Sequence, residues 1–188
     1  MALSPPVPRE PLHRREITLH GYRRTDGLFD VEAHLVDTKA YAFTLVDRGE
    51  VPPGVPLHEM RARMTVDQDM LIVAFEAATE HGPYAICPQA APNFARLAGL
   101  VIGPGFLKAA NARVGGTVGC THLRELLQQM GTVAFQTLYA VRRDGEAAPA
   151  TAVAPARPPM LETCLAYATD SPVVRRDWPD FYTGPDAA

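Results

Sequence analysis

Hydrophobic and polar residues alternate through much of the first half of the chain, which is the pattern of half-buried β-strands. The first alternating stretch covers residues 16–36 and is interrupted by Thr25-Asp26-Gly27. An Asp-Gly pair between alternating segments favours a tight turn, because glycine adopts positive φ without strain. We therefore predict a β-hairpin here, followed by a third strand over residues 41–46.

A second hairpin is predicted from residues 57–66 and 70–79, which flank Asp67-Gln68-Asp69. The first of these strands alternates, and we expect His58 to be a core histidine because it falls on the apolar face. The second strand is apolar on both faces, which is typical of a central strand. Glu76 is the carboxylate that interrupts this apolar run.

The hydrophobic period changes from two to helical after Pro83. A helix is predicted over residues 89–100, and a second, short helix follows Gly103-Pro104-Gly105 as far as about Asn111. The strongest helical pattern covers residues 121–141, with a predicted buried stripe of Leu123, Leu126, Leu127, Met130, Val133, Ala134, Phe135, Leu138 and Val141. Hairpins followed by helices predict an α+β fold, in which an antiparallel sheet of two hairpins packs against C-terminal helices.

We predict a single α+β domain over residues 1–146, in which the proline-containing residues 1–12 form an extended arm. Residues 147–159 are rich in alanine and proline and show no period, as expected of a linker. Residues 160–188 are predicted to be a tail that docks on the domain, with Trp178, Phe181 and Tyr182 as anchors.

Charge and cysteine content narrow the class of function. The formal net charge is −3, so a nucleic-acid partner is not expected. No apolar run approaches the roughly 20 residues of a membrane-spanning helix, and the N-terminus lacks the pattern of a secretion signal. Three widely spaced cysteines, Cys87, Cys120 and Cys164, indicate reduced thiols and a cytoplasmic protein. An open sheet edge would favour a homodimer.

A glycine-rich loop, Gly115-Gly116-Thr117-Val118-Gly119-Cys120-Thr121-His122, leads into the predicted long helix. A thiolate and an imidazole are suitable ligands for zinc or iron, so Cys120 and His122 are candidate metal ligands, with Cys87 as a further one. Cys120 could instead be a nucleophile with a histidine as base, or the pair could be ordinary core and capping residues. The glycines lack the Lys-Ser/Thr of a phosphate-binding loop, so no nucleotide cofactor is expected.

The second strand of the first hairpin carries Asp30, Glu32 and His34 on one face, because side chains two residues apart point the same way. They lie about 7 Å apart along the strand, which is close enough for a shared acid–base site. The alternative is a polar face that is simply in contact with solvent. Glu76 is a further candidate general acid, because apolar surroundings would raise its proton affinity, although a partner such as Arg96 or Arg113 would explain it as well.

Several stretches, in order along the chain, carry a family resemblance. They are residues 21–39 (including Tyr22-Arg23-Arg24-Thr25-Asp26-Gly27), Tyr84-Ala85-Ile86-Cys87-Pro88, Gly119-Cys120-Thr121-His122-Leu123 with Ala134-Phe135-Gln136-Thr137, and Leu161-Glu162-Thr163-Cys164. The chain resembles the uncharacterised bacterial family known as domain of unknown function 2889. This resemblance implies that the gene lies near genes for the catabolism of aromatic compounds. It does not imply a defined reaction. The family pattern is Cys-His where this chain reads Cys164-Leu165.

The order of elements also resembles sulfur-carrier and iron–sulfur scaffold proteins of the IscU/SufE type. In that comparison Cys87 and Cys120 with His122 would occupy the positions of metal or sulfur ligands, and the usual third cysteine has no match.

The sequence thus favours a small-molecule enzyme with lyase- or hydrolase-like acid–base chemistry. In one version of this hypothesis, zinc or iron assists the reaction. Its substrate would be an aromatic or acyl compound. The expected site lies between the strand face of Asp30, Glu32 and His34 and the helix start at Cys120 and His122. The alternatives are a sulfur or metal carrier of scaffold type and a non-catalytic partner subunit.

Overall fold

The computed structural model describes residues 3–145, 157, 158 and 160–185. The chain divides into two compact units, Met1–Glu146 and Ala147–Ala188, which are described separately. The predicted linker over 147–159 falls outside the described residues except for Arg157 and Pro158. The docking of the tail on the first unit stays a prediction.

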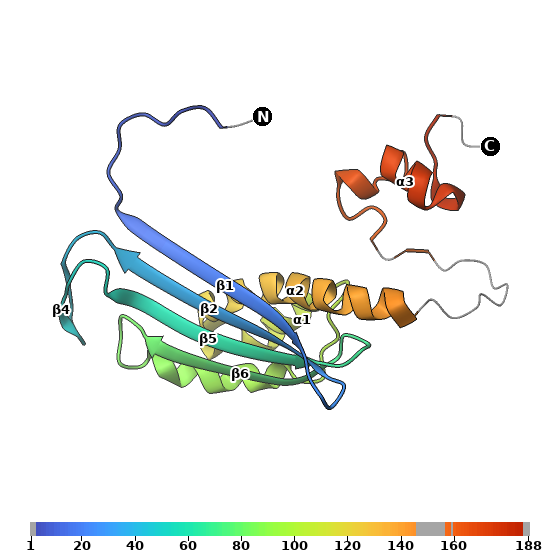
Figure 1. Ribbon diagram of the computed structural model, residues 1–188. Coiled ribbons are helices and arrows are strands. Elements are labelled where there is room, and N and C mark those ends of the chain that lie inside the picture. Colours follow the sequence, from blue (N-terminus) through green and yellow to red (C-terminus); the bar gives the residue numbers. More distant parts are fainter. Residues whose placement is uncertain (1–2, 146–156, 159, 186–188) are drawn as a thin grey trace. The chain divides into compact units, whose positions relative to one another are not determined.

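The first unit is built on a four-stranded antiparallel sheet in the order β1-β2-β5-β6 (Figure 1). Its strands are β1 (His13–Arg23), β2 (Phe29–Lys39), β5 (Pro56–Val66) and β6 (Ile72–His81). Both predicted hairpins are present, β1–β2 and β5–β6, and the α+β prediction is confirmed. Gly27 in the first turn has a φ of 87°, which explains the glycine of the Asp-Gly pair.

One strand prediction is confirmed only in part, and another is wrong. The predicted third strand is shortened to β3 (Phe43–Leu45), which pairs with β4 (Gly49–Val51) in a separate two-stranded sheet. The predicted central strand, β6, lies at the edge and pairs only with β5 within the four-stranded sheet. Its second apolar face consists of Val73, Ala74 and Ala78, which are exposed. Apolar residues are often exposed at protein surfaces. Their presence on both faces of β6 therefore does not show that this strand lies in the middle of the sheet.

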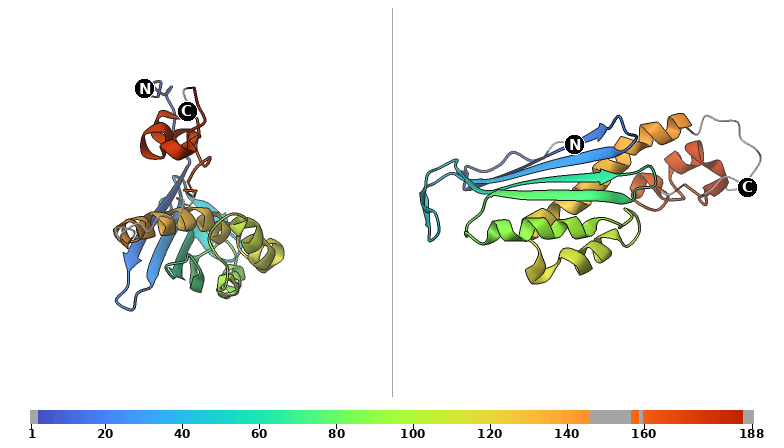
Figure 2. Two further views of the ribbon diagram at one scale, coloured as in Figure 1. Left: turned by 90° about the vertical axis from the view of Figure 1, so that its right-hand side faces the viewer. Right: turned by 90° about the horizontal axis from the view of Figure 1, so that it is seen from below.

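Helices cover one face of the sheet (Figure 2). They are the 3₁₀ helix η1 (Cys87–Leu97), α1 (Phe106–Val114), the 3₁₀ turn η2 (Gly116–Val118) and α2 (Thr121–Gly145). The helix predicted over residues 89–100 is present as η1 but is a 3₁₀ helix, and Pro92 inside it has no N–H to donate to an α-helical hydrogen bond. It packs against β6, whereas α2 packs across β1, β2 and β5.

The hydrophobic core lies between the helices and the covered face of the sheet. From α2 it takes most of the predicted stripe, with Leu123, Leu126, Leu127, Met130, Ala134 and Leu138 buried, and Val133, Phe135 and Val141 partly buried against the core. From the sheet it takes the odd-numbered residues of β2, such as Val31 and Leu35, and the even-numbered residues of β5, such as Met60 and Met64. The even-numbered residues of β2 and the odd-numbered residues of β5 point to the other, polar face, against which no described helix of the first unit packs.

The second unit contains the 3₁₀ turns η3 (Leu165–Tyr167) and η4 (Pro179–Phe181) around the short helix α3 (Pro172–Asp177). Ser171 caps α3, since its Oγ accepts a hydrogen bond from the Val174 amide. Val174 is fully buried, and the rings of Tyr167 and Trp178 lie 5.7 Å apart.

Candidate functional site

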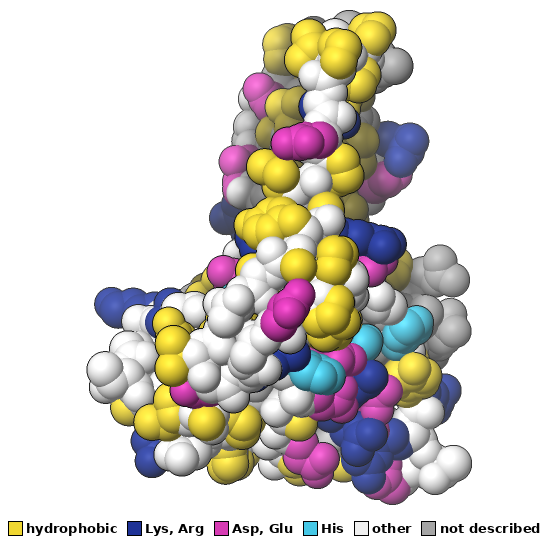
Figure 3. All heavy atoms as spheres, turned by 90° about the vertical axis from the view of Figure 1, so that its left-hand side faces the viewer, with side chains coloured by type: hydrophobic (Ala, Val, Ile, Leu, Met, Phe, Trp, Pro, Cys, Tyr) yellow, Lys and Arg dark blue, Asp and Glu magenta, His cyan; other side chains and the backbone are white. Residues whose placement is uncertain are grey.

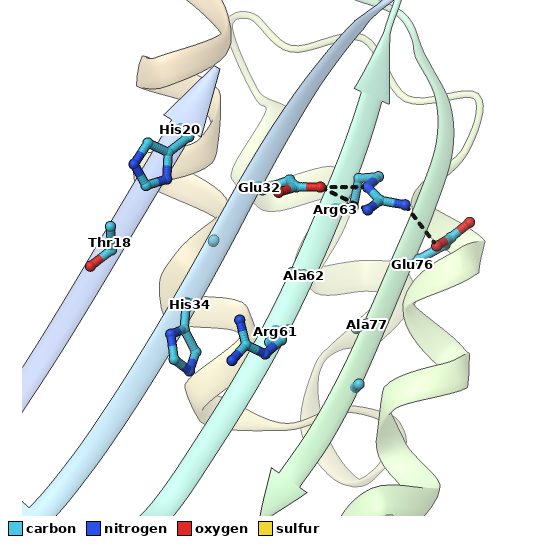
Figure 4. A pocket seen from close by; sticks show the side chains of 11 residues that line it. Thr18, His20, Glu32, His34, Arg61, Ala62, Arg63, Glu76 and Ala77 are labelled. Carbon is cyan, nitrogen blue, oxygen red and sulfur yellow. Dashed lines mark hydrogen bonds and ion pairs between the residues drawn. The ribbon is translucent and has the colours of Figure 1, made fainter. Parts of the chain in front are cut away.

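The open face of the sheet carries a groove of about 510 Å³ (Figure 4). It contains side chains from all four strands, because residues that are paired across an antiparallel sheet lie side by side on the same face. The polar side chains that line it are Thr18, His20, Glu32, His34, Arg61, Arg63 and Glu76. The structure therefore places Glu32, His34 and Glu76, three of the four predicted catalytic residues, in one groove.

A chain of charged residues crosses the groove from β2 to β6. Arg63 Nη2 lies 2.7 Å from Glu32 Oε1, and Arg63 Nη1 lies 3.7 Å from Glu76 Oε2. The dashed lines of Figure 4 mark these contacts. The fourth predicted catalytic residue, Asp30, does not line the groove: it accepts a hydrogen bond of 2.7 Å from Thr65 Oγ1 and contacts Arg24 at 3.4 Å.

Glu59 lies next to the groove and contacts two histidines, of which His34 lines the groove and His81 does not. His34 Nε2 lies 2.8 Å from Glu59 Oε1, and His81 Nδ1 lies 2.9 Å from Oε2 of the same carboxylate. Glu59 is only 15% exposed, and burial alone would raise its pKa. The hydrogen bonds from His34 and His81 outweigh burial and hold the pKa of Glu59 below its ordinary value. Glu59 is therefore an ionised acceptor at neutral pH.

This end of the sheet faces the viewer in Figure 3, where histidine side chains lie beside acidic and basic ones. Sequence reasoning did not identify Glu59 as a functional residue. The sequence nevertheless contains a pattern that points to it. Glu59 lies on the polar face of an alternating strand, and antiparallel pairing with the strand of His34 could bring the two polar faces together.

Glu76 does not have the apolar surroundings that the general-acid hypothesis required. Its side chain is 75% exposed, and its partner is Arg63 instead of Arg96 or Arg113. The reason is that Glu76 lies on the face of the sheet opposite the core, beside Arg63 of β5. Arg113 instead donates hydrogen bonds to the carbonyl oxygens of Arg96 and Ala98.

We expect Glu76→Gln to change the free energy of unfolding by less than about 0.5 kcal/mol, because ion pairs between exposed side chains contribute little. Urea unfolding of the variant and the unmodified protein measures this. A loss of more than about 1 kcal/mol would mean that the carboxylate has a structural role that its exposure does not suggest.

A second polar cluster lies on the opposite, helix-covered face, around Asp37 at the end of β2. Asp37 is 1% exposed and follows the odd-numbered apolar residues of its strand. Arg15 on β1 donates to both of its oxygens, from Nε to Oδ1 and from Nη2 to Oδ2, each at 2.7 Å. His58 Nδ1 on β5 lies 3.1 Å from Oδ2, and His13 Nε2 lies 3.3 Å from Oδ1.

The start of α2 completes this cluster. His122 Nε2 lies 3.8 Å from Asp37 Oδ2, and its ring stacks on that of His58 with 3.8 Å between the centroids. Cys120 Sγ lies 3.9 Å from the other ring nitrogen of His122, Nδ1. Gly119 allows the sharp approach to the helix, since a Cβ there would meet the Val114 carbonyl oxygen at 1.9 Å.

Burial and neighbouring charge act on the titration of this cluster. Burial lowers the pKa of His58, and the nearby His122 lowers it further. Burial, followed by the Arg15 charge, lowers the pKa of His122. Burial alone would raise the pKa of Asp37, but the hydrogen bonds and charge of Arg15 lower it overall. The cluster thus holds a carboxylate and two neutral imidazoles at neutral pH.

Cys87 is not part of either cluster. Among the described residues, the groups of side chains that could hold a metal ion are Asp37 with His58 and His122, and His34 with Glu59 and Glu80. Cys87 lies instead beside Gly82, where an added Cβ would meet Cys87 Cβ at 2.8 Å. Of the predicted metal ligands Cys87, Cys120 and His122, the structure brings only Cys120 and His122 together.

The expected single site between the strand face and the helix start is wrong. His34 and Asp37 are three residues apart on β2, so their side chains point to opposite faces of the sheet. Because α2 packs on the covered face, His122 contacts Asp37, with Cys120 beside His122, on the face opposite Asp30, Glu32 and His34. The described residues therefore form two candidate sites, the open-face groove and the Asp37 cluster.

Residues 13–136 match the family described as Protein of unknown function (DUF2889), and the chain belongs to this family. No curated protein and no solved structure matches the chain. In the described part of the chain, no helix combines the length and the apolar character needed to cross a membrane.

Proposed function

We propose that this member of the DUF2889 family is an enzyme that uses the open-face groove for acid–base chemistry of the lyase or hydrolase class, with His34 as the general base. The observation that carries the proposal is the 2.8 Å contact between His34 Nε2, in the groove, and Glu59 Oε1 next to it. A histidine oriented by a carboxylate is a common arrangement for proton transfer.

The charge state of Glu59 determines which nitrogen of His34 can act. An ionised carboxylate only accepts hydrogen bonds, so a neutral His34 ring must carry its proton on Nε2. Nδ1 is then the unprotonated nitrogen that can take a proton from a substrate or from an attacking water. Protonated His34 would in turn be stabilised by Glu59, which makes the same residue a proton donor in a later step.

The arginines of the groove indicate the charge of the substrate. Arg61 and Arg63 are about half exposed. Arg61 pairs with Glu80 and lies 3.7 Å from Glu59, and Arg63 pairs with Glu32 and lies 3.7 Å from Glu76. Exposed pairs of this kind are weak, so a substrate carboxylate could exchange for the glutamates. Arginine binds carboxylates through two parallel hydrogen bonds. We therefore propose a small aromatic or acyl carboxylate as substrate, in the cytoplasm, where the free cysteines of the chain would remain reduced.

We expect His34→Gln to lower the rate of hydrolysis of mono-p-nitrophenyl succinate, a chromogenic ester that carries a carboxylate, by about 100-fold, the low end of the contribution of a general base. The assay uses a background in which Cys87, Cys120 and Cys164 are all replaced by serine, so that no thiol cleaves the ester. His20→Gln is the matched control, since His20 lines the same groove from β1 but is not hydrogen bonded to Glu59. The expected rate of this control is close to that of the background protein.

Circular dichroism must show that His34→Gln is folded. Equal hydrolysis by His34→Gln and the background protein, or an equal loss in His20→Gln, would contradict the proposed role of His34.

A further inference from the structure

We propose that Asp37, His58 and His122 form a binding site for one divalent transition-metal ion of the zinc or iron class on the helix-covered face of the sheet. The site lies on the other side of the sheet from the groove and does not depend on the chemistry proposed there. Two imidazoles and one carboxylate are a ligand set that suits both metals.

The spacing of the ligand atoms fits a single ion. His58 Nδ1 and His122 Nε2 lie 3.1 and 3.8 Å from Asp37 Oδ2, and one ligand atom from each residue lies within 4.8 Å of the others. Ligands at 2.0–2.1 Å from a tetrahedral ion are separated by about 3.4 Å. These two distances fall on either side of this value. Binding would require side-chain rotations that also separate the His58 and His122 rings, whose centroids lie 3.8 Å apart.

Three different elements supply the ligands. Asp37 lies near the end of β2, its register partner His58 lies near the start of β5, and His122 lies in the first turn of α2. Binding would therefore tie the start of α2 to the two central strands. The two histidines are partly exposed and the carboxylate is buried, so an ion can reach the imidazoles from solvent.

Arg15 orients the carboxylate without using all of its acceptor capacity. A carboxylate offers about four lone-pair positions. Arg15 uses one on each oxygen, and His13 approaches Oδ1. The remaining position of Oδ2 is used by His58 Nδ1, 3.1 Å away, and an ion would take the place of the proton in this hydrogen bond, with the His58 proton moved to Nε2. Hydrogen-bonded carboxylate ligands are usual in metal sites, where the outer partners hold the ligand in place.

Cys120 is assigned to the outer shell of this site. Its Sγ lies near Nδ1 of His122, whereas Nε2 of the same ring faces Asp37. A histidine that binds a metal through one nitrogen usually donates its other N–H to a neighbouring acceptor, and Cys120 is placed to accept it. Three protein ligands leave a fourth position of a tetrahedral ion open.

The test is a titration of chelator-treated protein with Co²⁺, followed by visible absorption, and with Zn²⁺, followed by calorimetry. We expect one ion per chain. His122→Gln should weaken binding at least tenfold, and His58→Gln is a second variant with the same expected effect. The matched control is His34→Gln, which removes a histidine from the other candidate group, His34 with Glu59 and Glu80. It should bind as the unmodified protein does.

The outcomes separate the possible explanations. Absence of binding to the unmodified protein would overturn the proposal and leave the cluster as an ion-pair network. Loss of binding in His34→Gln with retention in His122→Gln would overturn it by moving the ion to the groove face. A thiolate-to-cobalt absorption band would overturn the outer-shell assignment of Cys120. Far-UV circular dichroism of each variant must match that of the unmodified protein, so that lost binding is not unfolding.

Discussion

Arg15→Met is expected to lower the free energy of unfolding by about 3 kcal/mol, because it leaves the buried Asp37 carboxylate without its arginine partner. Arg15 donates to both oxygens of Asp37 and also pairs with Glu125 on α2. This expected loss of free energy lies at the low end of the range for breaking a buried ion pair. The Arg15 side chain is 32% exposed, so water can partly replace the guanidinium in the variant. Urea unfolding followed by circular dichroism measures the change.

Arg14→Met is the matched control. Arg14 is the neighbouring arginine on β1, is 71% exposed and pairs with Glu16, so its replacement should change the unfolding free energy by less than about 0.5 kcal/mol. Adding Asp37→Asn to Arg15→Met should restore part of the unfolding free energy, because it removes the buried carboxylate charge that Arg15 no longer neutralises. If the double variant is no more stable than Arg15→Met, the loss comes from the packing of Arg15 and not from the buried carboxylate.

Phe94→Ala is expected to cost about 4 kcal/mol of unfolding free energy, because it opens a cavity where a fully buried ring lies between η1 and the sheet. The Phe94 ring lies 6.0 Å from that of Phe75 on β6, centroid to centroid. It also borders the loop before α2, since a Cβ at Gly119 would lie 3.6 Å from its Cε2. The same variant should therefore loosen the approach to Cys120.

Thermal and urea unfolding measure the stability loss, and amide hydrogen exchange at Gly119 and Cys120 measures the effect on the loop. The control is Tyr84→Ala, which removes an exposed ring just before η1 and should change stability by less than about 0.5 kcal/mol. Faster exchange at residues 119 and 120 in Phe94→Ala but not in Tyr84→Ala is the expected result. Unchanged exchange would mean that the loop is held by other contacts, such as the hydrogen bond from Asn93 Nδ2 to the Val118 carbonyl.

The predicted hairpins were correct because their signals are local. A period of two and the turn at Asp26-Gly27 define β1 and β2 without reference to the rest of the chain. The same locality explains why Glu32 and His34 were correctly placed on one face, with Asp30 beside them. The long helix was recognised in the same way, and α2 begins at Thr121 as predicted.

Predictions that needed long-range information were wrong. The apolar run of β6 suggested a central strand, but strand order is set by how the hairpins associate, and β6 became an edge. The 3₁₀ conformation of η1 had a signal that was not used, namely Pro92 within the expected helix. Its exact conformation still depends on packing against β6, which no local pattern describes.

The same distinction between local and long-range information applies to the residues of the candidate sites. The alternation along β2 is sufficient to identify Asp37 as a buried residue, because it continues the odd-numbered apolar face of the strand. A carboxylate buried at this position needs a partner. His58 is the core histidine that its place on the apolar face predicted. That the partner of Asp37 is Arg15, and that His58 is hydrogen bonded to the same carboxylate, follows from the pairing of β2 with β1 and β5.

The sequence by itself determined which side chains share a strand face and where α2 begins, because these depend on backbone geometry over a few residues. Only the tertiary structure decided which face of the sheet α2 covers. That choice placed His122 beside Asp37 and His58, and left His34 in an open groove with Glu59 next to it. Such contacts join residues up to 85 positions apart, from Asp37 to His122, and they depend on the packing of the whole core, which no short segment encodes.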